Sequence, residues 1–171
     1  MGRAISLGSK GEVDAMLIRL SLIETSMPEF LRVPVILGEG EIFLYCQTGI
    51  TCNEEVLNDG EKIVGIFSGV NATKMIMEDK KASVYEISTF DRAHSMFTKK
   101  RLNYLISLDK SNLGYYIADN PNKYQQVIIK KYQAFHYLHQ SKKSLLPELT
   151  KALDAAVQEV GPIERAKLIL N

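Results

Sequence analysis

Four consecutive residues, Ser68-Gly69-Val70-Asn71, have the types and spacing to bind an anion. They lie between a predicted strand and a predicted helix. The first N–H groups of a helix have no partner within it and carry about half a positive charge. Gly69 allows close approach to the backbone, and Ser68 and Asn71 add side-chain donors. The alternative is that Ser68 or Asn71 only caps the helix.

Two charged residues also directly follow predicted strands, Arg19 after "VDAMLI" and Asp109 after "LNYLISL". In open α/β sheets, ligands bind at the carboxyl ends of strands. A guanidinium at such a position can hold a carboxylate through two parallel hydrogen bonds. Alternatively, Arg19 forms an ion pair with Glu24, and Asp109 is the N-cap of a helix starting near Ser111.

Short apolar runs alternate along the chain with patterns of helical period. Such alternation is typical of an α/β fold with a largely parallel sheet. The predicted strands are 13–18, 32–37, 41–47, 62–67, 82–87, 102–107, 125–130 and 134–139. The predicted helices are 71–78, a helix capped by Ser88-Thr89 that runs to Thr98, 111–118, 142–159 and a last one that runs to Leu170 after Gly161-Pro162.

The sequence also contains a faint internal repeat. The segments "SKGEVDAMLIR" (9–19) and "TKKRLNYLISL" (98–108) align at a constant offset of 89 residues, with Lys10 on Lys99 and Asp14 on Asn103. This repeat predicts two lobes built on the same plan.

Composition limits the classes of function. Apolar residues make up 46% of the 171 residues, charged residues 24%, and the net charge is +1. A balanced charge does not favour nucleic acid as a partner, since that interaction needs a clustered basic surface. Cys46 and Cys52 are too few for a zinc site, so no metal and no cofactor is expected. Two free thiols are favoured over a local disulfide across a hairpin-like loop.

The order of the motifs resembles the extracellular solute-binding proteins of family 3, which bind polar amino acids for ABC importers. "GEVDAMLIRLS" is similar to the family's "GkvDavi.gms", and "LNDGEKIVGIFSGVNATKMI" to its "L.gkkVGv..Gtt.e". "ISTFDRAHSMFTKKRLNYLISLDKSNLGYYI" resembles "s.eeal.al..GrvDavv.D...a.y.i". "FHYLHQSKKSLLPELTKALDAAV" resembles the returning strand and the long helix that closes the first lobe.

The resemblance implies a two-lobed α/β fold of the periplasmic-binding-protein type II. Lobe 1 would comprise 1–40 and 128–171, and lobe 2 would comprise 41–127. The expected partner is a small zwitterion such as an amino acid, delivered to an ABC permease from the periplasm. The turn at 68–71 would hold its carboxylate and Asp109 its ammonium group. The family's "tpeR" arginine is absent, and Arg19 would substitute for it.

The chain also departs from the family, because it lacks the N-terminal segment that supplies the first strand and helix. The first lobe would then have an open apolar edge, which we expect a second copy to cover by dimerisation or a domain swap. Two other functions share this fold. One is a sensor or orphan binding module without a transport role. The other is a dehydratase-like enzyme, which is disfavoured because no nucleophile–base motif is present.

Overall fold

The computed structural model describes residues 3–108 and 122–161. These residues fall into two compact units, Met1–Glu39 with Tyr132–Asn171, hereafter unit 1, and Gly40–Lys131, hereafter unit 2. Two long strands, β3 (Gly38–Gln47) and β7 (Tyr124–His139), each run across the boundary between the units. The predicted helix at 111–118 and the predicted C-terminal helix lie outside the described residues.

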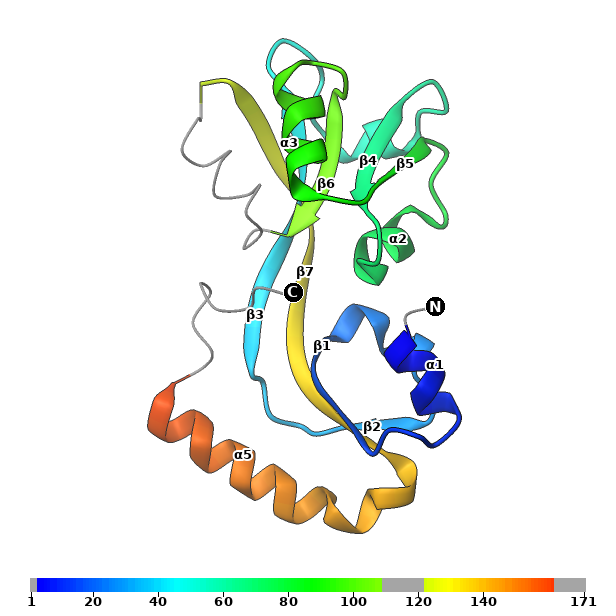
Figure 1. Ribbon diagram of the computed structural model, residues 1–171. Coiled ribbons are helices and arrows are strands. Elements are labelled where there is room, and N and C mark those ends of the chain that lie inside the picture. The colour runs from blue at the N-terminus through cyan, green and yellow to red at the C-terminus, as the bar shows by residue number, and fades with distance from the viewer. Residues whose placement is uncertain (1–2, 109–121, 162–171) are drawn as a thin grey trace. The chain divides into compact units, whose positions relative to one another are not determined.

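Unit 2 contains the parallel part of the sheet. Strand β4 (Ile63–Phe67) pairs in parallel with both β5 (Ser83–Ile87) and β6 (Tyr104–Leu108), and β3 pairs antiparallel with β6. Helix α3 (Phe90–Thr98) covers this sheet (Figure 1). It packs through Ala93 and Phe97, which are fully buried in one cluster with Tyr45 and Leu105. The shorter helix α2 (Asn71–Met77) follows β4, and the 3₁₀ helix η2 (Glu54–Asn58) precedes β4.

Unit 1 is built around the second half of β7. Strands β1 (Ala15–Leu20) and β2 (Phe30–Arg32) both pair antiparallel with β7, and the 3₁₀ helix η1 (Ser21–Ser26) connects them. Helix α1 (Arg3–Ser9) precedes β1. Helix α5 (Leu146–Val160) places its apolar stripe against a small core of Val33, Val35, Leu37 and Leu138. That stripe consists of Leu146, Leu149, Leu153 and Val157.

The prediction of a largely parallel sheet is wrong. The strand order is β1-β7-β3-β6-β4-β5 with β2 also on β7, and the pairs β1–β7, β2–β7 and β3–β6 are antiparallel. Alternating strand and helix patterns favour parallel pairing only where a helix connects neighbouring strands. Here β3 and β7 pair with strands from distant parts of the sequence. Whether such strands run parallel or antiparallel is not encoded by the local sequence.

Several predicted elements have different bounds in the structure. The strand predicted at 32–37 ends at Arg32, because Pro34 has no N–H to donate to a ladder, although Val33 and Leu37 still donate to β7. The two strands predicted at 125–130 and 134–139 are the single strand β7. The long helix begins as a 3₁₀ turn, η3 (Gln140–Leu145), before α5. Gly161 ends α5 with a φ of 79°, as predicted.

Candidate functional site

The turn between β4 and α2 is formed by backbone hydrogen bonds. The N–H of Ser68 donates to Ile87 at 2.9 Å, and that of Val70 donates to Phe67 at 3.2 Å. Gly69 has a φ of 82°, which glycine adopts without steric cost. The N-cap of α2 is Val70, and no side chain bonds to the cap. The alternative that Ser68 or Asn71 only caps this helix is therefore wrong.

The same turn leaves backbone donors available. The N–H groups of Gly69 and Asn71 donate to no carbonyl of the residues that the structure describes. Ser68 and Gly69 are exposed and Asn71 is half-buried. An anion placed here would meet N–H groups that carry partial positive charge.

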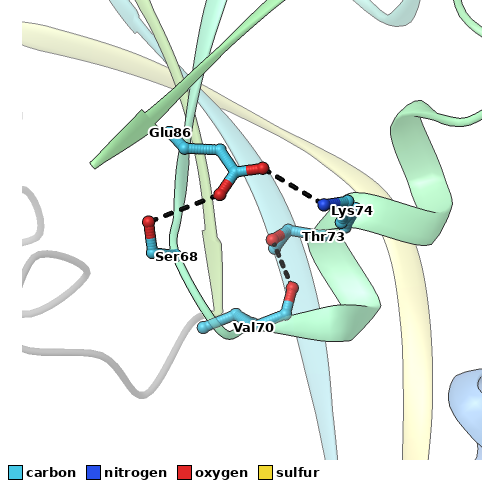
Figure 2. A network of polar contacts seen from close by, with 5 residues as sticks. All are labelled: Ser68, Val70, Thr73, Lys74 and Glu86. Atoms are coloured by element: carbon cyan, nitrogen blue, oxygen red, sulfur yellow. Dashed lines mark hydrogen bonds and ion pairs between the residues drawn. The ribbon is translucent and has the colours of Figure 1, made fainter. Parts of the chain in front are cut away.

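An acidic side chain already engages this turn, as Figure 2 shows. Glu86, on β5, accepts a hydrogen bond from Ser68 Oγ at 3.4 Å through Oε2. Its other oxygen, Oε1, lies 3.2 Å from Lys74 Nζ on α2. The hydroxyl predicted to bind a ligand carboxylate thus binds a carboxylate of the protein itself. A carboxylate ligand at this turn has to replace Glu86 on Ser68.

Arg19 lies at a bulge in β1. Its Nη1 donates to the carbonyls of Leu17 and Ile18, each at 3.0 Å. Ile18, which directly precedes Arg19, has a φ of 42°, which is unusual for a β-branched residue. Glu24 forms its ion pair with Arg32, not with Arg19. The alternative that Arg19 forms an ion pair with Glu24 is therefore wrong, and Nη1 of Arg19 is bonded to the carbonyls of the two preceding residues.

A second charged cluster in unit 1 was not predicted from the sequence. Arg32 Nη1 lies 3.3 Å from Glu24 Oε2, and the hydroxyl of Tyr137 donates to the same oxygen at 3.3 Å. The Arg32 guanidinium also lies over the Phe135 ring, 4.8 Å from its centroid. We call Glu24, Arg32, Phe135 and Tyr137 the Glu24–Arg32 cluster. Tyr137 is 113 residues from Glu24, so no local pattern could have indicated this contact.

Burial raises the pKa of Tyr137 to about 12, and the negative charge of Glu24 and the hydrogen bond to it act in the same direction. The nearby Arg32 charge opposes this shift. Tyr137 is therefore a neutral hydroxyl at any physiological pH, and it can serve as a permanent donor to Glu24.

The remaining predicted site residue, Asp109, lies outside the described residues. Arg19 belongs to unit 1 and Ser68, Gly69, Val70 and Asn71 belong to unit 2.

Cys46 and Cys52 form a disulfide with Cα atoms 5.8 Å apart, so the favoured prediction of two free thiols is wrong. The sequence allowed either state, because the spacing permits a bridge without requiring it.

Unit 2 also has an open cavity of about 650 Å³, away from the turn at 68–71. Its lining includes Thr51, Asn53, Asp59, Lys62 and Asn103. Asp59 and Lys62 neutralise each other at 3.4 Å, so the cavity has no unpaired cation for a carboxylate.

Among residues 3–108 and 122–161, no three His, Cys, Asp or Glu side chains gather as metal ligands. Within the same ranges, no helix has the length and apolar content needed to cross a membrane.

Comparison with known proteins gives a consistent result for the fold. No family model matches the sequence, and no curated protein matches it. Tv2483 bound to L-arginine is similar in structure, with a TM-score of 0.64, 11% identity, and coverage of 92% of this chain and 65% of that one. The solute receptor for L-cysteine of Neisseria gonorrhoeae has a TM-score of 0.64, 12% identity, and coverage of 96% and 65%.

The ligand-binding core of GluR0 from Nostoc punctiforme, in complex with L-glutamate, is also similar. Its TM-score is 0.66 at 16% identity, and the match covers 92% of this chain and 73% of that one. This chain therefore has the two-lobed α/β fold of periplasmic solute-binding proteins. It spans only 65% of the length of the first two proteins.

Proposed function

We propose that this protein binds a small polar solute, an amino acid or a similar zwitterion, in the periplasm. It would deliver this solute to an ABC permease. Within unit 2, Ser68, Gly69, Val70 and Asn71 would receive the solute's carboxylate. Within unit 1, Arg19 is the cation available to a carboxylate. Asp109 would receive the ammonium group. No step of this proposal requires catalysis, a metal or a cofactor.

The observation that carries the proposal is the open turn before α2 within this fold. Three structurally similar proteins are bound to arginine or glutamate or are receptors for cysteine, and these similarities support an amino acid as the solute. The unengaged N–H groups of Gly69 and Asn71 supply the donors that a carboxylate needs.

A thermal-shift screen of the purified chain against the common amino acids tests the proposal. A ligand that binds only the folded state raises the melting temperature, by an amount that grows with its concentration. Ser68→Ala should reduce that shift without changing the melting temperature of the unliganded protein. If no amino acid shifts the melting temperature, the proposed function is wrong for this chain.

A sensory or orphan binding module is the second candidate. It is favoured by the similarity to the ligand-binding core of GluR0 and to the periplasmic VFT2 domain of BvgS from Bordetella pertussis, at a TM-score of 0.58 and 14% identity. Reconstitution with a candidate permease separates the two functions. Ligand-dependent stimulation of the permease ATPase supports transport, whereas binding without stimulation supports the sensory module.

We further propose that a second copy of the chain covers the outer edge of β1. Within the described residues β1 is one of the two strands that end the sheet, and its Leu17 side chain is 72% exposed. An unpaired strand edge with an exposed apolar side chain favours pairing with another chain. Light scattering should give the mass of a dimer, and Leu17→Lys should shift the population toward monomer. A wild-type protein that is monomeric at all concentrations contradicts this proposal.

A further inference from the structure

The face of the unit 1 sheet opposite α5 carries two arginines. Arg19 pairs with Phe135, and Arg32 pairs with Tyr137, two residues further along β7. Paired residues of antiparallel strands point to the same face, as do residues two apart in one strand. Both arginines therefore share a face with these two rings. Helix α5 covers the other face, where it packs on Leu138.

The two arginines differ in their engagement. The Nη1 of Arg19 is shared by two backbone carbonyls at the bulge of β1. Arg32 instead lies on the Phe135 ring, which fixes the plane of the guanidinium through a cation–π contact. An arginine that is held by an aromatic ring and remains accessible is the better preorganised of the two for binding a carboxylate.

The ion pair of Glu24 with Arg32 leaves binding capacity on both partners. It uses Nη1 of Arg32 and Oε2 of Glu24. In the part of the chain that the structure describes, Nε and Nη2 of Arg32 and Oε1 of Glu24 have no hydrogen-bond partner. The two side chains are 45% and 38% exposed, so a solute can reach them. The fully buried Tyr137 gives Glu24 a second partner besides Arg32.

We infer that the Glu24–Arg32 cluster is the zwitterion-binding element of unit 1. Arg32, in place of Arg19, receives the carboxylate of an α-amino acid. Glu24, retained by Tyr137, receives the ammonium group in place of Asp109. When no solute is bound, the two side chains pair with each other. This inference rests on the proposed function and names the residues through which unit 1 selects a zwitterion over a simple acid or a simple amine.

Isothermal titration calorimetry with paired probes tests the inference. L-Glutamate and glutarate differ by the amino group, and L-arginine and agmatine differ by the carboxylate. Glu24→Gln should weaken L-glutamate binding at least tenfold and strengthen glutarate binding, because Arg32 is released from its internal partner. Arg32→Gln should weaken L-arginine binding at least tenfold and leave agmatine unaffected. A purely structural role would change both probes of a pair in the same direction.

Two controls separate this effect from general loss of structure. Lys142→Gln breaks an ion pair of the same unit, with Asp14 at 3.5 Å, and should change no affinity. Arg32→Lys retains the charge but not the planar pair of donors, and should still lose about tenfold in L-arginine binding if Arg32→Gln fails to fold.

The outcomes are distinguishable. Binding by the wild type that Glu24→Gln and both Arg32 variants leave unchanged overturns the inference while the proposed function stands. Loss of binding in Arg19→Gln but not in the Arg32 variants also overturns it and restores Arg19. If neither amino acid binds the wild type, the proposed function and the inference fail together for these solutes.

Discussion

Gly11 and Lys100 occupy equivalent positions in the two units, at the offset of 89 residues that the sequence repeat predicted. Each has a positive φ, 71° and 54°, and lies two residues after the last residue of a helix. The N–H that follows Gly11 donates to Leu7 at 3.0 Å, and the N–H that follows Lys100 donates to Met96 at 2.8 Å. Both helices thus end in the same Schellman-type motif before a strand.

Because glycine occupies this conformation without strain and lysine does not, exchanging the two should have opposite effects. Lys100→Gly should raise the free energy of unfolding by about 0.5 kcal/mol, since relief of strain exceeds the added entropy of the unfolded chain. Gly11→Ala should lower it by about 1 kcal/mol. Urea denaturation of both variants measures the two changes, and changes of the same sign would contradict this explanation.

Gly65 in β4 lies against core side chains with no room for a methyl group. A Cβ there would lie 2.5 Å from Leu102 Cδ2 and 2.8 Å from Leu105 Cδ1. Gly65→Ala should therefore lower the free energy of unfolding by about 1–3 kcal/mol through overpacking. Gly60→Ala is the matched control, because its Cβ would meet only the Lys81 carbonyl at 3.9 Å. Equal stability of the two variants in chemical denaturation would refute the packing argument.

The disulfide between Cys46 and Cys52 closes a short loop, with a sequence separation of 6. Restriction of the unfolded chain by such a loop is worth about 2 kcal/mol. The double variant Cys46→Ala/Cys52→Ala should lose this amount in denaturation under oxidising conditions. Addition of a reductant should destabilise the wild type and leave the double variant unchanged. A wild type insensitive to the reductant would show that the bridge contributes no stability.

We expect His136 in β7 to make the stability of the protein depend on pH. Burial lowers the pKa of this imidazole below its ordinary value of 6.5. The unfolded chain therefore binds the proton more readily, and stability should fall as the pH drops from 6.5 through the lower pKa of the folded state. His136→Gln should flatten this part of the profile of melting temperature against pH. An identical slope for the wild type and His136→Gln would exclude His136 as the cause.

Glu86 should weaken the binding of carboxylates at the turn before α2, because it already accepts the hydrogen bond of Ser68. Glu86→Gln removes the competing charge and should increase the affinity for L-glutamate several-fold in calorimetry. Lys74→Gln should decrease it, since the positive charge is lost from the same network. Glu78→Gln, an exposed acid on the same unit, is the control. A decrease with Glu86→Gln would mean that this turn receives a cationic group instead.

Local features of the fold were predictable, but contacts between distant segments were not. The sequence Ser88-Thr89 predicted the start of α3, and Thr89 indeed accepts a hydrogen bond from the N–H of Arg92 at 3.3 Å. Such a cap depends on residues three apart. The antiparallel pairing of β7 with β1, and the contact of Tyr137 with Glu24, depend on residues more than 100 positions apart.

One pattern could have indicated more. "FLYCQ" (43–47) and "FHYLH" (135–139) share an aromatic spacing, and both end the strands that pair with the repeated segments. Asn103 accepts from the N–H of Gln47, and Asp14 accepts from that of His139. The repeat therefore extends to the partner strands, so each repeated strand could have been assigned its antiparallel neighbour from this second similarity.

The passage of β3 and β7 across the boundary between the units has a consequence for how the chain can be divided. A protease needs a locally unfolded stretch about its scissile bond, and both crossings fall within strands, at 39/40 and 131/132. Limited digestion should therefore not release either unit as a fragment. Grafting unit 2 onto another protein would require fusion within two strands.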